Sequence, residues 1–285
     1  MTYLFTFFDR DAKILYHTGL ESSPNSVAVC QKTGDIIICD WKQGNVRVFC
    51  ADLSLKKKVF DNSSATNDKQ TAANGVAIDD EGLIYVAEEK NDQITVYKDY
   101  KPYGTIETMI GPCEMVIDGN RNLIVCESRN YCIQICRRDG TLVESYGSKG
   151  NGRYQFESHP LFMSISKDSS RIVISDRDGH VYLFGSYDEQ NKKFKGGVSP
   201  FTKARGVAFD NDENIVVADA PEGRLVVITT DGELVRTIGE PGSGPGQLKW
   251  PRGIAFTPDG SKLVVCERDN HRIQIFQYND LVAMT

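Results

Sequence analysis

The chain has 285 residues, a net charge of −6 and eight cysteines. It contains no apolar stretch of membrane-spanning length, and its overall acidity excludes a polycation that binds nucleic acid through total charge alone. Residues Met1–Phe8 are apolar but lack a basic leader and a small-residue cleavage site, so we expect no signal peptide. The cysteines form no CxxC pair, which favours reduced thiols and a cytoplasmic location.

The first predicted element is a strand at residues 13–18. Residues 10–19 match residues 138–147, where a tight turn and an outer strand are expected. We therefore predict that residues 13–18 supply the outer strand of the last repeat and close a ring, which removes exposed strand edges. Residues Phe5–Phe8 also have the pattern of a strand, but the sequence assigns them no neighbour.

Six repeats follow along the chain. Each begins with a short apolar strand, such as Val27–Val29 or Val207–Phe209, and an acid follows 12 or 13 residues later. Subtracting the positions of these acids gives spacings of 48, 39, 49, 43 and 48 residues for Asp40, Glu88, Glu127, Asp176, Asp219 and Glu267. Repeats of this size are typical of closed arrays.

One repeat is predicted to be four antiparallel strands. In the fifth repeat, apolar runs at 206–209, 214–218, 225–228 and 234–238 are separated by turn residues. We predict an all-β, six-bladed propeller in a single domain spanning 1–285, with blades at about 26–61, 75–108, 114–147, 162–198, 206–239, and 253–280 plus 13–18.

The recurring acids are interpreted as architectural. A carboxylate can accept hydrogen bonds from the backbone of the loop that it opens, and a catalytic pair would need only two acids. The residue before each acid is small, as expected where blades converge on an axis: Cys39, Ala87, Cys126, Ser175, Ala218 and Cys266.

The sixth repeat carries the most specific motif. A Gly/Pro-rich lead-in at 239–248 precedes the strand, and Asn-His-Arg-Ile-Gln-Ile-Phe at 270–276 follows the acid. In these features the chain resembles NHL-repeat propellers, and within them the C-terminal domain of TRIM-NHL proteins. The resemblance implies a piece of a larger regulator, whose full-length form carries a RING-type ubiquitin ligase, and an RNA-binding module in post-transcriptional regulation of mRNA. The alternative that it leaves open is a protein-interaction module that recruits ubiquitin-ligase substrates or cofactors.

One face of the predicted propeller is basic. The lead-in to each first strand and the loop after each second strand emerge at the same end of the blade, here called the top face. Basic, amide and aromatic side chains at that end suit a polyanion, because arginine planes and aromatic rings stack on unpaired bases. The candidate RNA-binding residues are Asn25, Trp41, Lys42, Asn74, Lys90, Arg129, Tyr131, Arg177, Arg205, Arg252, Arg268 and His271.

Two readings of these residues remain open. Propeller loops are commonly polar and charged without binding anything, and Trp41 could pack on a neighbouring loop. If the face does bind, we expect single-stranded RNA and protein partners, no DNA and no membrane, with the isolated propeller monomeric. The four histidines share no metal-ligand spacing, so no catalytic residue, metal or cofactor is predicted and we expect no enzyme activity in the propeller itself.

Overall fold

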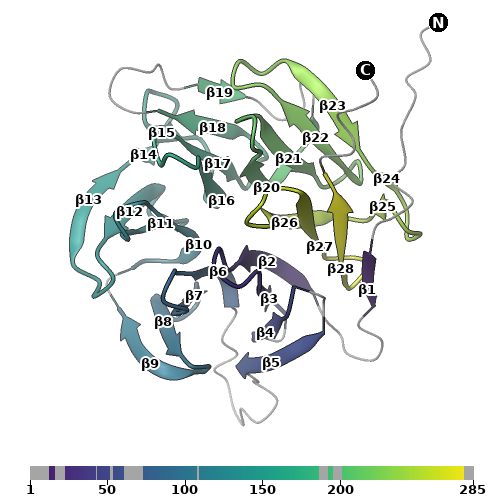
Figure 1. Cartoon of the computed structure of the whole chain (residues 1–285). Helices are drawn as coiled ribbons and strands as arrows, with labels where there is room; N and C mark the ends of the chain where they lie inside the picture. The colour runs from purple at the N-terminus through teal and green to yellow at the C-terminus, as the bar shows by residue number, and fades with distance from the viewer. Residues whose placement is uncertain are drawn as a thin grey trace, which may run out of the picture.

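The computed structural model describes residues 13–16, 23–42, 44–51, 54–60, 73–107, 109–185, 192–194 and 201–278. Six four-stranded antiparallel sheets are arranged around a common centre, so the prediction of a six-bladed all-β propeller is confirmed (Figure 1). No helix of the described residues is long and apolar enough to cross a membrane.

The first three blades follow one another along the chain. They consist of β2 (Pro24–Val29), β3 (Ile36–Asp40), β4 (Asn45–Phe49) and β5 (Leu55–Phe60); β6 (Ala73–Ile78), β7 (Ile84–Glu88), β8 (Gln93–Lys98) and β9 (Lys101–Ile106); and β10 (Pro112–Ile117), β11 (Leu123–Glu127), β12 (Cys132–Cys136) and β13 (Leu142–Tyr146).

The last three blades repeat this order. They consist of β16 (Pro160–Ile165), β17 (Ile172–Asp176), β18 (Val181–Phe184) and β19 (Lys192–Phe194); β20 (Ala204–Phe209), β21 (Ile215–Asp219), β22 (Arg224–Ile228) and β23 (Leu234–Ile238); and β26 (Pro251–Phe256), β27 (Lys262–Glu267) and β28 (Arg272–Gln277) with β1 (Lys13–Tyr16). Two short parallel pairs, β14 (Ser148–Lys149) with β15 (Gln155–Phe156) and β24 (Glu240–Pro241) with β25 (Gln247–Leu248), form in the Gly-rich lead-ins.

The ring is closed by the two ends of the described chain. Strand β1 pairs antiparallel with β28, in a register that sets Lys13 opposite Ile275 and Tyr16 opposite Arg272 (Figure 1). The predicted closure by the N-terminal strand is therefore confirmed. The pairing covers the outer edge of β28, which would otherwise be open to association with another chain. The predicted strand at Phe5–Phe8 lies outside the described residues.

The core lies between the blades. The second strand of a blade, such as β21, is buried along its whole length because sheets pack on both of its faces. One apolar cluster joins Val216 and Leu225 of the fifth blade to Ile254, Leu263 and Phe276 of the sixth. A single blade cannot bury both faces, so each one depends on its two neighbours.

Every innermost strand carries a bulge at the same place. The register shifts between Pro24 and Ser26 in β2, and the same irregularity occurs near the start of the other five first strands, β6, β10, β16, β20 and β26. A bulged residue leaves the hydrogen-bond ladder and its side chain is re-aimed. The six bulges encircle the axis and hold Asn25, Asn74, Cys113, Leu161, Arg205 and Arg252, here called the mouth ring.

Close packing near the axis explains the small residues there. A Cβ atom on Gly75 would overlap the carbonyl oxygen of Cys113, and one on Gly206 would overlap that of Arg252. The thiol of Cys39 lies 3.6 Å from the Gly75 carbonyl oxygen, on the neighbouring blade. All eight cysteines are unbridged. Cys39, Cys126 and Cys266 thus fill narrow space between converging strands, as the sequence indicates.

Candidate nucleic-acid interface

Backbone hydrogen bonds join the two sets of top-face loops. The residue after the acid donates its N–H to a lead-in carbonyl in five blades: Trp41 to Ser23, Ser128 to Gly111, Arg177 to His159, Ala220 to Lys203 and Arg268 to Trp250. These bonds are 2.9–3.2 Å long. In each of these blades, the loop after the second strand and the lead-in to the first strand therefore lie side by side at the same end, as predicted for the top face.

The recurring acids hold this surface together from below. Asp219 is fully buried and its Oδ1 accepts the backbone N–H groups of Thr202 at 3.0 Å and Lys203 at 2.9 Å. In the first blade, Oδ1 of Asp40 accepts the N–H groups of Ser23 and Lys42. Buried carboxylates are tolerated when donors surround them. These contacts agree with the architectural interpretation, and they extend it, because the acids also bind the lead-in.

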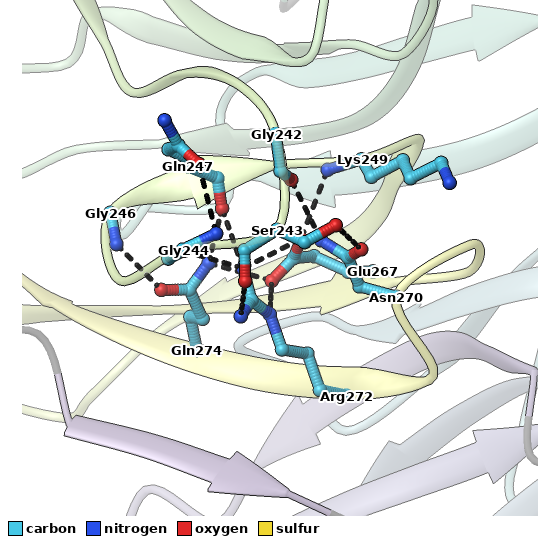
Figure 2. Close-up of polar contacts among 10 residues, drawn as sticks. All are labelled: Gly242, Ser243, Gly244, Gly246, Gln247, Lys249, Glu267, Asn270, Arg272 and Gln274. Carbon is cyan, nitrogen blue, oxygen red and sulfur yellow. Dashed lines mark hydrogen bonds and ion pairs between the residues drawn. The ribbon is translucent and has the colours of Figure 1, made fainter.

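The NHL-like motif of the sixth blade is used internally (Figure 2). The guanidinium of Arg272 donates to Glu267 at 2.6 Å and to the lead-in carbonyls of Ser243, Gly244 and Gln247 at 2.7–2.9 Å. Gln274 also donates to Glu267, at 2.6 Å. Arg272 is only 3% exposed, so it serves the fold and does not face a ligand.

Figure 2 also shows Lys249 and Asn270, which contact Glu267 beside the Arg272 cluster. The backbone N–H of Lys249 binds Glu267 at 3.0 Å, while its side chain points away from the cluster. Asn270 donates to Glu267 and to the Gly242 carbonyl. His271, at the tip of the turn, is exposed and has a φ of 53°. His271 is therefore the motif residue that the turn presents to solvent.

The mouth ring has an amide half and a basic half. Asn25 is 3% exposed, and its amide nitrogen donates to the carbonyl and the side-chain oxygen of Asn74 at 2.6 and 2.9 Å. Asn74 in turn donates to the thiol of Cys113 at 3.3 Å and to Glu89 at 2.8 Å. These amides are engaged with one another, so they brace the mouth.

Three guanidinium groups crowd the other half of the mouth, here called the arginine cluster: Arg205, Arg252 and Arg268. Burial, together with the positive charges of the other two arginines, lowers the pKa of Arg252 to about 10. Burial also lowers the pKa of Arg205, and Arg268 adds to that effect. Like charges are therefore held together in a partly desolvated place, where an added anion gains most.

Only one arginine of the cluster forms a direct ion pair with a carboxylate among the described residues. Nη1 of Arg205 donates to the carbonyl oxygens of Ala204 and Asp176, which are not charged groups. Nε of Arg252 is buried with no hydrogen-bond partner. Arg268 alone forms an ion pair, with the partly exposed Asp269 at 2.7 Å. Two of the three guanidinium groups thus form no direct ion pair among the described residues, although Asp176 and Asp178 act on Arg205 from a distance and Asp269 acts on Arg252.

Aromatic rings lie against this cluster. The guanidinium of Arg268 lies 4.6 Å from the ring centroid of Trp250, and that of Arg252 lies 5.5 Å from Phe162. Sequence reasoning missed both rings. Trp250 immediately precedes the sixth first strand, one residue after Lys249, and this position in the lead-in was the signal available.

The remaining predicted residues fall into two groups. Trp41 is 47% exposed, and Lys42, Lys90 and Arg177 are also exposed. Arg129 instead pairs with Asp92 and donates to the Glu89 carbonyl, and the Tyr131 hydroxyl lies 3.1 Å from Nε2 of His159. Arg129 of the third blade is thus neutralised by Asp92 of the second, whereas the arginine cluster lies on the fifth and sixth blades.

The described residues contain no group of three or more His, Cys, Asp or Glu side chains that could hold a metal ion. His180 is the most engaged histidine, with Nδ1 2.8 Å from the buried Asp176 and Nε2 3.6 Å from Glu157. This arrangement fixes the loop of the fourth blade.

This geometry defines a β-propeller whose blades are tied by a buried acid and whose top-face loops carry exposed charge. Within that class, the NHL repeat family matches residues 248–276, the lead-in, strands and motif of the sixth blade. The sixth blade of this propeller is thus similar to an NHL repeat. The chain is 21% identical over 153 residues to the protein brain tumor of Drosophila melanogaster, covering 53% of this chain and 14% of that relative.

Solved structures share the fold. Virginiamycin B lyase from Staphylococcus aureus superposes with a TM-score of 0.63 at 15% identity, covering 94% of this chain and 99% of that one. The Cps50 (Swd1) β-propeller domain of Myceliophteria thermophila gives 0.65 at 11% identity, covering 93% and 99%. At such identities the likeness shows the fold alone.

Proposed function

We propose that this propeller binds single-stranded or hairpin RNA on the top face of its fourth to sixth blades. The observation that carries the proposal is the arginine cluster, where Arg205 and Arg252 form no direct ion pair with a carboxylate among the described residues. A phosphate placed there would relieve the repulsion between the guanidinium groups. The salt dependence of such contacts comes from the counterions that the nucleic acid releases.

The surrounding side chains suit unpaired RNA. Trp41 and the Trp250–Arg268 pair offer flat surfaces on which bases can stack, at about 1–3 kcal/mol per base. Exposed Arg177 and Lys249 lie on loops of the same face and are placed to contact phosphates. Arg205, at 8% exposure, contributes positive charge from below, with little surface for base contact.

The resemblance to NHL-repeat proteins also suggests a cellular role for the propeller. As part of a longer TRIM-NHL-like protein, the propeller would bring a repressor or a ubiquitin ligase to mRNA in the cytoplasm. The chain spans only 14% of the length of the relative that it matches, so the remaining activities of such a protein lie outside this propeller. We propose no catalysis by the propeller itself.

A protein-interaction module is the second candidate. The net charge of −6 favours it, because an acidic molecule repels RNA at long range. In that case the arginine cluster would receive an acidic segment of a partner, and substrates or cofactors of a ubiquitin ligase would be recruited through protein contacts.

The test is a selection of random RNA oligomers on the purified chain, followed by titration of the enriched sequence. The variants are Arg252→Gln in the cluster and Arg177→Ala on the adjacent loop. The matched control is Arg121→Ala, which removes an equally charged, exposed arginine paired with Asp80 and Glu81 on the opposite side of the blades. All three proteins are compared with the parent by circular dichroism.

RNA binding predicts a shared enriched motif whose affinity falls in Arg252→Gln and Arg177→Ala and stays at the parent value in Arg121→Ala. Its logarithmic salt slope should approach about −0.7 per phosphate neutralised. Absence of enrichment, or equal affinity in all three variants, would reject RNA for this face. Binding of an acidic peptide that is lost in the same two variants would then support the protein module.

A further inference from the structure

A second concave site lies on the axis, on the side opposite the top face. A cavity of about 520 Å³ runs along the axis and is lined by all six innermost strands. Its lining continues into the turns between first and second strands, including Asp118, Lys167 and Asn211. The cavity therefore opens on the lower face. The volume of the cavity falls in the range of small-molecule sites.

The inner end of the cavity carries a buried carboxyl group. On each strand the lining begins just beyond the mouth ring, at Val27, Val76, Glu114, Phe162, Gly206 and Gly253. Glu114 is 7% exposed. Its Oε2 accepts a hydrogen bond from the Ser26 hydroxyl at 2.7 Å, and its Oε1 lies 3.3 Å from the Met115 N–H. No described arginine, lysine or histidine forms an ion pair with it.

A buried acid without a cation is unusual and costly when charged. Burial raises the pKa of Glu114 to about 8, although its hydrogen bonds oppose the shift. The thiols of Cys39, Cys126 and Cys266 face the same group, and burial keeps their pKa values high as well. Burial thus favours the uncharged forms of these groups at the inner end of the cavity, and none of the lining residues at that end is basic.

The rest of the lining favours an organic cation. The strands present mainly Val, Ala, Ile, Met and Phe side chains to the cavity, which suit an apolar body. The charged lining residues are the carboxylates Glu114, Asp118, Asp210 and Glu213 and the single lysine Lys167. Glu213 is paired with Arg171. The two remaining acids near the entrance, Asp118 and Asp210, outnumber Lys167, so the entrance is negatively charged.

We propose that this axial cavity binds a small organic amine, with the ammonium group paired to Glu114 and the apolar body against the strand walls. The ammonium supplies the positive charge that the carboxyl lacks in the described structure. On binding, Glu114 loses its proton to the solvent, so the buried group becomes a carboxylate only when its partner is present. This site is independent of the top face and of the RNA proposal.

The experiment uses 4-phenylbutylamine as the probe and 4-phenylbutanol as its neutral counterpart. Both are titrated into the full chain at pH 7 by calorimetry, in phosphate and in Tris buffer, whose ionisation enthalpies differ. We expect the amine to bind at least about tenfold more tightly than the alcohol and to release close to one proton. The expected stoichiometry is one amine per chain.

Two variants and a spectroscopic signal make the test specific. Glu114→Gln keeps the shape and the Ser26 contact and should abolish both the preference for the amine and the proton release. Asp212→Asn, which removes an exposed acid from a turn of the lower face, should leave both unchanged. With ¹³C-methyl methionine, the signals of Met115 and Met163, which line the cavity, should shift, whereas that of Met109 should not.

Three outcomes would overturn the proposal. The first is no binding of the amine by the folded parent protein, and the second is equal binding of amine and alcohol. The third is an unchanged amine affinity in Glu114→Gln. Binding that disappears equally in Asp212→Asn would show general attraction to an acidic surface, and it too would reject the cavity as the site.

Discussion

Arg272 and Glu267 form an ion pair with both side chains buried, and Nε of the arginine lies 2.6 Å from Oε1 of the glutamate. The pair ties the last strand of the chain to the lead-in of the same blade through the carbonyls of Ser243, Gly244 and Gln247. Its burial means that the most family-specific stretch of the sequence is a structural clamp.

Removing the clamp should destabilise the fold. Arg272→Ala would leave Glu267 as a buried charge without its cation and would remove the guanidinium donor from three lead-in carbonyls. Two of these carbonyls keep another donor, that of Gln247 from Gln274 and that of Gly244 from the Gln247 N–H. We therefore expect a loss of about 3–5 kcal/mol in the free energy of unfolding. Urea denaturation measures it. Arg268→Ala, which breaks the more exposed pair with Asp269, should cost at most about 1 kcal/mol. Equal losses in the two variants would contradict this account.

Arg252→Met should separate stability from binding. The folded-state pKa of Arg252 is lowered to about 10 from an ordinary value of 12.5, so the protonated side chain opposes folding at every pH below about 10. We expect the variant to be more stable at pH 7 by about 1–2 kcal/mol and to bind RNA more weakly. Thermal unfolding and RNA titration on the same sample check both effects. A destabilised variant would show that Arg252 contributes to packing more than to repulsion.

Glu114 should make stability fall as pH rises. Its folded-state pKa, about 8, exceeds the ordinary value of 4.5, so between these values the folded protein holds a proton that the unfolded chain has released. The group therefore stabilises the fold fully below pH 4.5, and this contribution is lost progressively up to pH 8. The slope is at most about 1.4 kcal/mol per pH unit.

Glu114→Gln should remove that slope. The difference in unfolding free energy between parent and variant, measured by urea denaturation at pH 5, 6, 7 and 8, isolates the contribution of this one group. We expect the variant to gain relative stability at each step. A constant difference across the range would mean that the carboxyl is not buried in the folded protein in solution.

Deletion of residues 1–16 should open the ring. The β1–β28 pairing would be lost, and β28 would present an unpaired edge. We expect a lower unfolding midpoint and concentration-dependent association, measured by thermal unfolding and by light scattering. A deletion variant that stays monomeric with an unchanged midpoint would show that the closing strand contributes little.

Much of this structure can be predicted from spacing alone. The period of the acids determines the number of blades, and the similarity of residues 10–19 to residues 138–147 predicts β1 because outer strands share a turn signature. The location of the top-face loops follows from the alternation of strand direction. These features are local or periodic, so a single sequence contains them.

The electrostatic detail was not predictable in this way. Arg129 follows a short strand, and Arg252 lies at the start of one. Arg129 nevertheless pairs with Asp92 on the adjacent blade, whereas Arg252 lies near two other arginines. Such pairings depend on which loops face each other across the ring. Phe162 and Glu114 have ordinary places in apolar strands, and only the bulges show that they line the axis.

The six bulges have a consequence for how this surface can change. Because a bulged residue stands outside the hydrogen-bond ladder, its identity is not constrained by strand pairing. The mouth ring holds two asparagines, a cysteine, a leucine and two arginines on an otherwise uniform frame. Substitution at these positions changes the side chains around the axis without breaking a strand pair, which makes the ring the place where the chemistry of the top face can vary most easily.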